Sequence, residues 1–183
     1  MSHLFSTPPV VEFRPSITHC PGCGGELKVR KTRTRTVSTL HLGRFRAREV
    51  FLICMQCAHT YRSEELCARV APGANFGYDV MVYAGKALFL RHRNEAEVVA
   101  ELAEKNVPIS PREVSLLGMK FIVSLAVAHQ RRAPDITALM QSRGGYICHL
   151  DATCEGRDPL LMSSIDSLSQ IVLGNVKLPA EDQ

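Results

Sequence analysis

The sequence predicts an α+β protein in which a cysteine-rich β region, a helical region and a small antiparallel sheet follow one another. Two Cys-x2-Cys pairs enclose a β-prone stretch, apolar residues of the central region recur at helical spacing, and residues after 145 alternate between apolar and polar. The chain has 183 residues, 45% of them apolar and 22% charged. This composition excludes a wholly disordered chain, a collagen-like repeat and a disulfide mini-protein.

Positive charge is concentrated towards the N-terminus. Residues 1–70 hold 11 basic and 5 acidic side chains, whereas residues 133–183 hold 3 and 7. This asymmetry suggests an anionic partner for one end of the chain. Residues 1–16 lack the apolar segment of an export signal, and the longest apolar run, within residues 121–128, is shorter than the ~20 residues of a membrane span. We therefore expect a cytoplasmic, nucleoid-associated protein without a membrane partner.

Breaks in composition divide the chain into segments. We expect a flexible arm over 1–16, a cysteine-rich β domain over 17–62, a helical region over 63–132, a loop with Pro134 over 133–145, and strands within 145–183.

The two cysteine pairs predict a structural zinc site. Cys20 with Cys23, and Cys54 with Cys57, are separated by 30 residues of β-prone sequence with a turn at Gly43. Zn²⁺ favours four such sulfur ligands in a tetrahedron, so residues 17–62 read as a zinc ribbon with a long hairpin. The alternative is one redox pair and one chance pair. His19 and His59 adjoin the pairs, but four cysteines already fill the site, and we interpret Cys67, Cys148 and Cys154 as packing thiols.

The hairpin is strongly basic. Eight basic side chains and no acidic ones lie from Lys28 to Arg48. Alternation along a strand places several of these charges on one face, where a phosphate backbone would relieve their repulsion. We expect Arg30, Arg33, Arg35 and Arg46 to contact DNA. The alternative is a solvated face that binds nothing.

The central region predicts three longer helices. The first covers 78–90, the second follows a cap at Asn94, and the third begins at Ser110, which with Glu113 forms a capping box. Val114, Leu117, Phe121, Leu125 and Ala128 form an apolar stripe on the third helix. A second apolar side, formed by Leu116, Ile122, Val123 and Val127, indicates burial by the C-terminal module or by a second subunit.

A tight turn followed by a sharply capped helix favours a helix-turn-helix. Such a motif presents the N-terminal side chains of its recognition helix to the major groove. Arg112, Ser115 and Met119 lie along one side of the third helix, and we expect Arg112 and Ser115 to contact DNA. An ordinary helical hairpin is the alternative.

The C-terminal segment predicts a meander of three antiparallel strands. The strands begin near 146, 160 and 170, with a turn at Asp166 and Ser167. Asp151 stands out because a carboxylate contributes nothing to the packing of an apolar strand. Its alternative interpretation is an aspartate at a strand end or turn.

These segments together resemble a known family. After the cysteine pairs come Gly77-Tyr78-Asp79, Phe89-Leu90-Arg91-His92-Arg93, Ile109-Ser110-Pro111-Arg112-Glu113-Val114, and Gly144-Gly145-Tyr146 leading into the Asp151 strand. From about Cys20 onward the chain resembles the N-terminal half of a prokaryotic DDE-type transposase, or a transposase-like protein, with an RNase H-like catalytic core. The Asp151 strand and its preceding glycines are the most specific part.

The resemblance implies DNA recombination by transposition, with Asp151 as the first metal-binding carboxylate of a two-Mg²⁺ site. The family's second Asp and final Glu would lie beyond Gln183. We therefore expect a truncated or fragmentary form, inactive alone, that needs Mg²⁺ only if the core is completed. Other readings are a transcription regulator and a protein-interaction zinc ribbon. A homo-oligomer through the C-terminal strands or the third helix is also expected.

Overall fold

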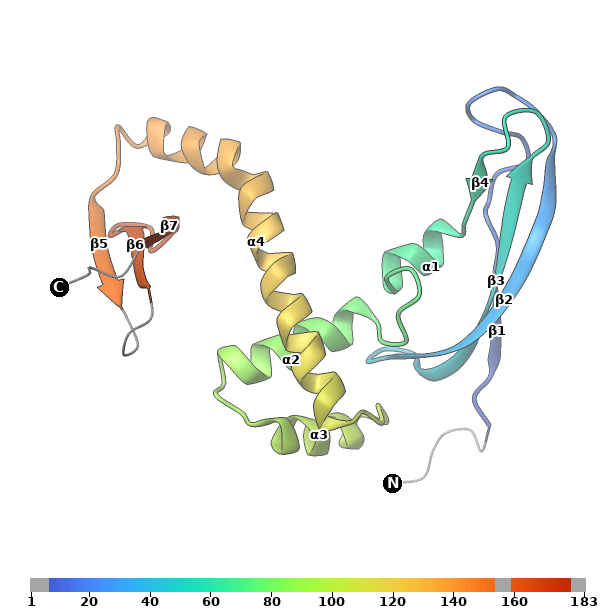
Figure 1. Ribbon diagram of the computed structural model, residues 1–183, viewed down its shortest axis with the longest axis horizontal. Helices are drawn as coiled ribbons and strands as arrows, with labels where there is room; N and C mark the ends of the chain where they lie inside the picture. Colours follow the sequence, from blue (N-terminus) through green and yellow to red (C-terminus); the bar gives the residue numbers. More distant parts are fainter. Residues whose placement is uncertain (1–6, 154–158, 179–183) are drawn as a thin grey trace. The chain divides into compact units, whose positions relative to one another are not determined.

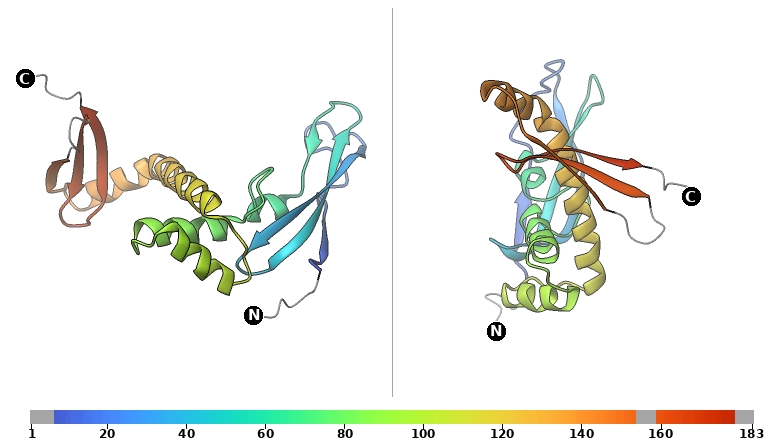
Figure 2. Two further views of the ribbon diagram at one scale, coloured as in Figure 1. Left: turned by 60° about the horizontal axis from the view of Figure 1, so that its bottom comes forward. Right: turned by 90° about the vertical axis from the view of Figure 1, so that its left-hand side faces the viewer.

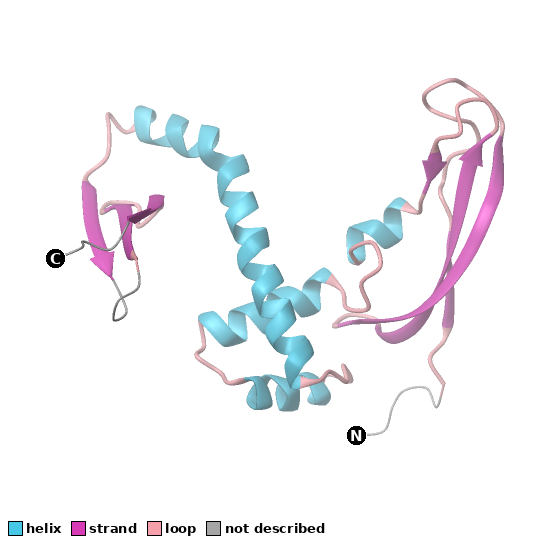
Figure 3. Cartoon of the chain, viewed as in Figure 1, coloured by secondary structure: helices cyan, strands magenta, loops and turns pink. Residues whose placement is uncertain are grey.

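The computed structural model describes residues 7–153 and 159–178. The chain divides into two compact units, residues 1–126 and 127–183, and each is described by itself (Figure 1). The first unit holds a four-stranded sheet and most of the helices, and the second holds a three-stranded sheet (Figure 3). The protein is therefore of the α+β type, as the sequence predicts.

The first sheet is built on a long hairpin. Strand β2 (Leu27–Thr39) pairs antiparallel with β3 (Gly43–Cys54), and Gly43 adopts a φ of 68° at the turn between them. The short strand β4 (Thr60–Tyr61) pairs with the cysteine end of β3. The expected hairpin is thus confirmed.

The N-terminal residues differ from the expected flexible arm. Residues Val10–Phe13 form strand β1, which runs parallel to β3 at the sheet edge (Figure 1). The Phe13 ring is buried and lies 6.0 Å from the Phe45 ring. Burial of this aromatic side chain stabilises the strand. Pro9, just before it, has no amide donor, but its carbonyl accepts a hydrogen bond from the Arg46 amide at 2.8 Å.

The two faces of the hairpin have different surroundings. One face carries Val37, Phe45 and Ala47, which pack with Phe13 and with Leu66 and Val70 beside the short helix α1 (Glu64–Arg69). The opposite face of β3 carries Arg44, Arg46 and Arg48, all exposed. Over residues 44–48, alternation therefore places core residues on one face of β3 and charges on the other.

Three longer helices complete the first unit. They are α2 (Tyr78–Phe89), α3 (Glu95–Glu104) and the first part of α4 (Pro111–Ser142), which lie together in Figure 2, left. Val80, Ala84, Val98, Leu102, Val107 and Val114 are among the residues of their shared core. Capping boxes at Asn94–Glu97 and Ser110–Glu113 begin α3 and α4 as expected.

Helix α4 is longer than the sequence predicts. The expected loop over 133–145 is helical as far as Ser142, with Pro134 inside the helix. Proline removes one backbone hydrogen bond, but residues beyond it still pack, because Met140 is buried in the second unit. Tertiary packing here outweighs a local helix-breaking signal.

Burial along α4 is also narrower than predicted. Val114, Leu117 and Phe121 are buried, but Leu125 and Ala128 are exposed. The second apolar side is exposed too, at Leu116, Ile122, Val123 and Val127. Burial of this second side by the C-terminal module or by a second subunit stays a prediction, as does the homo-oligomer.

The second unit contains the predicted meander. Strands β5 (Cys148–Thr153), β6 (Leu160–Asp166) and β7 (Val172–Leu178) pair antiparallel in the order β5-β6-β7 (Figure 2, right). The register shifts by a bulge between Ser164 and Ile165. Asp151 lies on β5 opposite Ser163.

Candidate metal centre and basic hairpin

The four predicted cysteines meet at one end of the first sheet. The sulfur atoms of Cys20, Cys23, Cys54 and Cys57 all lie within 4.8 Å of one another. The Sγ–Sγ distance is 3.6 Å between Cys20 and Cys57, and 3.4 Å between Cys23 and Cys54. Across residues 7–153 and 159–178, no other group of three or more histidine, cysteine or acidic side chains is arranged to hold a metal ion.

Tight turns bring each pair of sulfurs together. In the first turn, the Gly24 amide donates to the Cys20 carbonyl at 2.8 Å, and Gly24 has a φ of 71°, which favours glycine. In the second turn, the Ala58 amide donates to the Cys54 carbonyl at 3.1 Å. A Cβ at Gly25 would lie 3.0 Å from the Cys54 sulfur, so the two turns approach closely there.

Polar neighbours favour the thiolate form of two of these cysteines. The Tyr61 hydroxyl lies 3.0 Å from the Cys20 sulfur and lowers the pKa of that thiol to about 6. The backbone amides of Cys57 and Gln56 lower the pKa of Cys54, against the effect of burial. The Gly25 amide acts to lower the pKa of Cys23, but the neighbouring Cys54 and Cys20 sulfurs raise it to about 12.

This donor set fits a tetrahedral metal ion. Negative charge on one sulfur opposes deprotonation of its neighbours, and a divalent cation that binds sulfur would remove this conflict and join the two cysteine turns. Sequence reasoning missed Tyr61, which faces the site from β4, four residues beyond Cys57. His19 and His59 are exposed and are not among the four clustered ligands; the His59 ring packs against Tyr61 at 4.8 Å.

Two of the remaining three cysteines fall within the described residues, and neither is among the clustered ligands. Cys67 is half-buried on α1, and Cys148 is exposed on β5. The packing role expected for Cys148 is therefore not seen in the single chain. Cys154 falls outside the described residues.

The basic side chains of the hairpin divide between its two faces. Lys31, Arg33 and Arg35 share the face of Phe51, Glu49 and Ala47, whereas Arg46 lies on the other face beside Thr36. Arg30 lies at a β-bulge and donates from Nη1 to Thr60 Oγ1 at 3.0 Å. The four predicted DNA contacts therefore do not form one continuous surface.

A buried carboxylate occupies the face that carries Arg33 and Arg35. Glu49 is 1% exposed and accepts two hydrogen bonds from Arg62, at 2.8 and 3.0 Å. Arg35 is half-buried and donates to the Ala74 carbonyl, and burial lowers its pKa. These arginines hold α1 and the loop after it against the sheet. Glu49 was not singled out from the sequence, because an acidic residue after a basic run looks like a surface residue.

The start of α4 carries one basic and one acidic side chain, and a carboxylate of α3 lies beside it. Arg112 is exposed at the first turn. The Ser115 hydroxyl lies 3.1 Å from Glu95 Oε1 and 3.3 Å from the Pro111 carbonyl, and donates to these oxygens. Ser115 is thus engaged with a carboxylate within the first unit.

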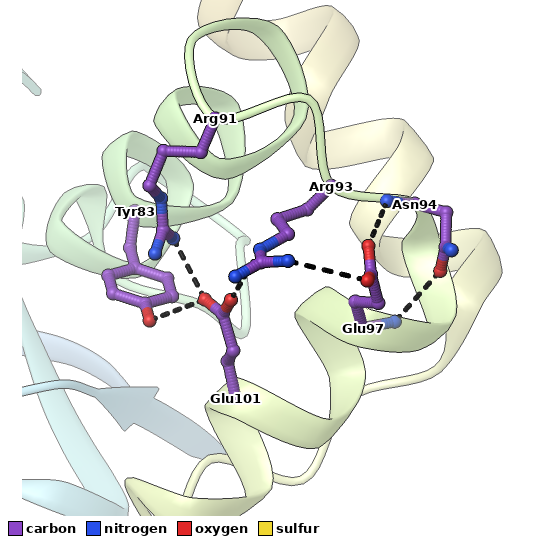
Figure 4. Close-up of polar contacts among 6 residues, drawn as sticks. All are labelled: Tyr83, Arg91, Arg93, Asn94, Glu97 and Glu101. Atoms are coloured by element: carbon purple, nitrogen blue, oxygen red, sulfur yellow. Dashed lines mark hydrogen bonds and ion pairs between the residues drawn. The ribbon is translucent and has the colours of Figure 1, made fainter.

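A polar network fixes the turn between α2 and α3 (Figure 4). Glu101 accepts hydrogen bonds from Tyr83 at 2.7 Å and Arg91 at 2.8 Å, and Arg93 lies 3.3 Å from it. The Tyr83 hydroxyl and the two arginines lower the pKa of Glu101, against the effect of burial. The basic residues after α2 are therefore partly neutralised by α3.

The two aspartates of the second sheet have opposite environments. Asp151 is exposed. Asp166 is buried and accepts hydrogen bonds from the amides of Ile147, Leu168 and Ser169, as well as from the Ser169 hydroxyl. The Ser169 hydroxyl and these amides lower the pKa of Asp166, against the effect of burial. The structural carboxylate of this sheet is thus Asp166, at the turn the sequence predicts.

Searches against known protein families, curated proteins and solved structures found no match to this chain. Within the described part of the chain, no helix combines the length and the apolar character needed to cross a membrane.

Proposed function

We propose that this chain is a zinc-stabilised DNA-binding protein of the transposase-like type. The observation that carries the proposal is that four cysteines cluster at one end of a hairpin that carries eight basic residues. In this proposal the ion bound by Cys20, Cys23, Cys54 and Cys57 is structural zinc, and residues 17–62 are a zinc ribbon. The metal fixes the shape of the hairpin, and its arginines neutralise phosphates.

The proposed DNA contact is mainly electrostatic. If the protein neutralises about five phosphates, the logarithm of its affinity for random duplex DNA should fall with the logarithm of salt concentration with a slope of about −4.5. Fluorescence anisotropy of a labelled duplex over a salt series measures this slope. A chain that holds its metal but does not bind DNA at low salt would contradict the proposal and would favour a protein-interaction zinc ribbon.

In the same proposal, α2, α3 and the start of α4 act as a helix-turn-helix, with Arg112 reading a base. Support comes from the exposure of Arg112 and the capping box that starts α4 at a fixed residue. Arg112→Ala should then weaken the free energy of binding to a preferred DNA sequence by about 1–3 kcal/mol and change binding to random DNA little. A DNA site selected from a random library provides the preferred sequence. An equal loss on both DNAs would make Arg112 a phosphate contact.

We further propose that β5, β6 and β7 correspond to the first strands of an RNase H-like core, with Asp151 as its first carboxylate. Support comes from the antiparallel order of the strands and the exposed position of Asp151. A two-Mg²⁺ site needs further carboxylates around the ions. Among the described residues, Asp151 belongs to no group of three or more metal-ligating side chains.

A further inference from the structure

The exposed face of the hairpin carries a regular row of arginines. Arg44, Arg46 and Arg48 alternate along β3 and all three are exposed. Their partners on β2 are Ser38, Thr36 and Thr34, of which the two threonines are exposed. Cross-strand partners share a face, so arginines and threonine hydroxyls form one surface, here called the arginine row.

The opposite face of the same hairpin is occupied by internal contacts. Glu49 is paired with Arg62 there, and both Arg62 and Lys31 lie about 5 Å from the Phe51 ring. Arg35 donates to the Ala74 carbonyl. The positive charges on this face are therefore partly used to hold the fold, and a buried carboxylate lies among them.

The arginine row has few such internal contacts. Its one ion pair among the described residues joins Arg48 Nε to Glu12 Oε2 at 3.7 Å, and both side chains are about half exposed. Alternate residues of a strand lie about 7 Å apart, so the three guanidinium groups follow a line of about 14 Å. Each DNA strand carries one phosphate per 3.4 Å of helix axis, so such a line can follow a phosphate backbone. Threonine hydroxyls beside it are donors for phosphate oxygens.

We propose that the arginine row is the surface on which duplex DNA lies, held by its phosphates without base reading. This inference rests on the DNA binding proposed above and adds the face that makes the contact. It replaces Arg33 and Arg35 as expected contacts and keeps Arg46. Glu12 weakens the surface at one edge by neutralising Arg48.

The test compares two variants of the full chain that lose the same charge. One variant is Arg44→Gln, Arg46→Gln, Arg48→Gln. The matched control is Lys28→Gln, Lys31→Gln, Arg33→Gln on the opposite face. The first variant should flatten the salt-dependence slope by about 2 to 3, at about 0.9 for each lost phosphate contact, and the control by less than 1. Equal flattening by both variants, or a larger effect of the control, would overturn the inference while leaving DNA binding intact.

A gain-of-function variant avoids dependence on the folding of the triple variants. Glu12→Gln frees Arg48, so affinity for duplex DNA should rise about two- to five-fold at low salt, with zinc content unchanged. An unchanged or lower affinity of Glu12→Gln for duplex DNA would count against the arginine row.

Vesicles of anionic phospholipid serve as a second ligand. A triple arginine variant that loses vesicle binding but keeps its DNA slope would assign this face to a membrane and overturn the inference. A wild-type chain that binds no DNA would instead remove the proposed function itself.

Discussion

Tyr61 and the four cysteines show how single atoms organise one end of the first sheet. The Tyr61 hydroxyl stabilises the Cys20 thiolate, and two backbone amides stabilise the Cys54 thiolate. Backbone hydrogen bonds of β4 and of the two turns position these groups around the sulfurs. A metal ion then adds the remaining attraction between the two turns.

Cys23→Ser should abolish stoichiometric zinc binding. A serine hydroxyl is a poor zinc ligand at neutral pH, and structural zinc supplies much of the folding free energy of small zinc modules. Elemental analysis should give one zinc per wild-type chain and none in the variant, while α2–α4 retain their helical signal. The control is Cys148→Ser, at an exposed strand position that is not among the clustered ligands. A variant that still holds one zinc per chain would contradict this assignment.

Individual residues could be predicted where a fixed spacing in the sequence marks them. Residues whose role depends on contacts with distant parts of the chain could not. The Cys-x2-Cys spacing located all four clustered cysteines. Glu49 is a buried carboxylate whose partner Arg62 lies 13 residues away, and no local pattern distinguishes it from a surface acid. Asp166 was placed at its turn, where Ser169 three residues on donates to it, but its contact with the Ile147 amide, 19 residues earlier, could not be predicted. Arg33 and Arg35 were assigned to DNA because alternation alone does not show which face a helix covers.

The packing of α2 against α4 depends on glycines where the helices approach. Gly85 of α2 faces Phe121 of α4, and Gly118 of α4 faces Leu88 of α2. A Cβ at Gly85 would lie 2.2 Å from the Phe121 ring, whereas a Cβ at Gly118 would lie 2.7 Å from the end of the Leu88 side chain. The two sites therefore differ in how easily a neighbour can move.

Gly85→Ala should lower the free energy of unfolding of the first unit by about 2 kcal/mol. Alanine favours an isolated helix by about 1 kcal/mol, but overpacking against a buried aromatic ring outweighs that gain. Gly118→Ala is the matched control and should be nearly neutral, because the Leu88 side chain can rotate. Urea unfolding followed by circular dichroism measures both. A Gly85→Ala protein as stable as the wild type would show that α2 and α4 are not this close.

Glu101→Gln should reduce both stability and its dependence on pH. The lowered pKa of Glu101 means that its carboxylate stabilises the folded state above the unfolded value of about 4.3, and that this contribution is lost as pH falls through the lower folded pKa. At pH 7 the free energy of unfolding of the variant should be about 1–2 kcal/mol below that of the wild type. Below pH 4 the difference between the two proteins should be smaller. Glu104→Gln, on the same helix and exposed, is the control. Equal pH profiles for Glu101→Gln and the wild type would show that the network in Figure 4 contributes nothing.

Helices and strands with strong local signals could be predicted, and those that depend on distant packing could not. The capping boxes located the starts of α3 and α4, and Gly43 located the hairpin turn. Strand β1 escaped prediction because it has four residues and depends on Phe13 packing against a strand more than 30 residues away. The end of α4 was misplaced because Pro134 is a local signal that packing of Met140 outweighs.

For the whole molecule, the chain should neither cleave nor join DNA with Mg²⁺ or Mn²⁺. Two-metal catalysis needs several carboxylates around ions about 4 Å apart. Within the described residues, Asp151 is not part of any group of three or more metal-ligating side chains. Asp151→Ala should leave DNA affinity and the unfolding midpoint unchanged, whereas Asp166→Ala should lower the midpoint by removing the acceptor for four donors. Metal-dependent nicking of a supercoiled plasmid that disappears in Asp151→Ala would contradict this prediction.

The central claim is that a metal-held basic hairpin binds DNA, and one titration tests it directly. Purified full-length chain is stripped of metal with a chelator, exchanged into chelator-free buffer, and titrated with Zn²⁺ in the presence of a labelled duplex. Anisotropy and bound zinc are recorded on the same samples. DNA binding should be weak in the stripped chain and recover in step with zinc binding, with full recovery at one zinc per chain. DNA affinity that is the same at zero and one zinc per chain would contradict the claim.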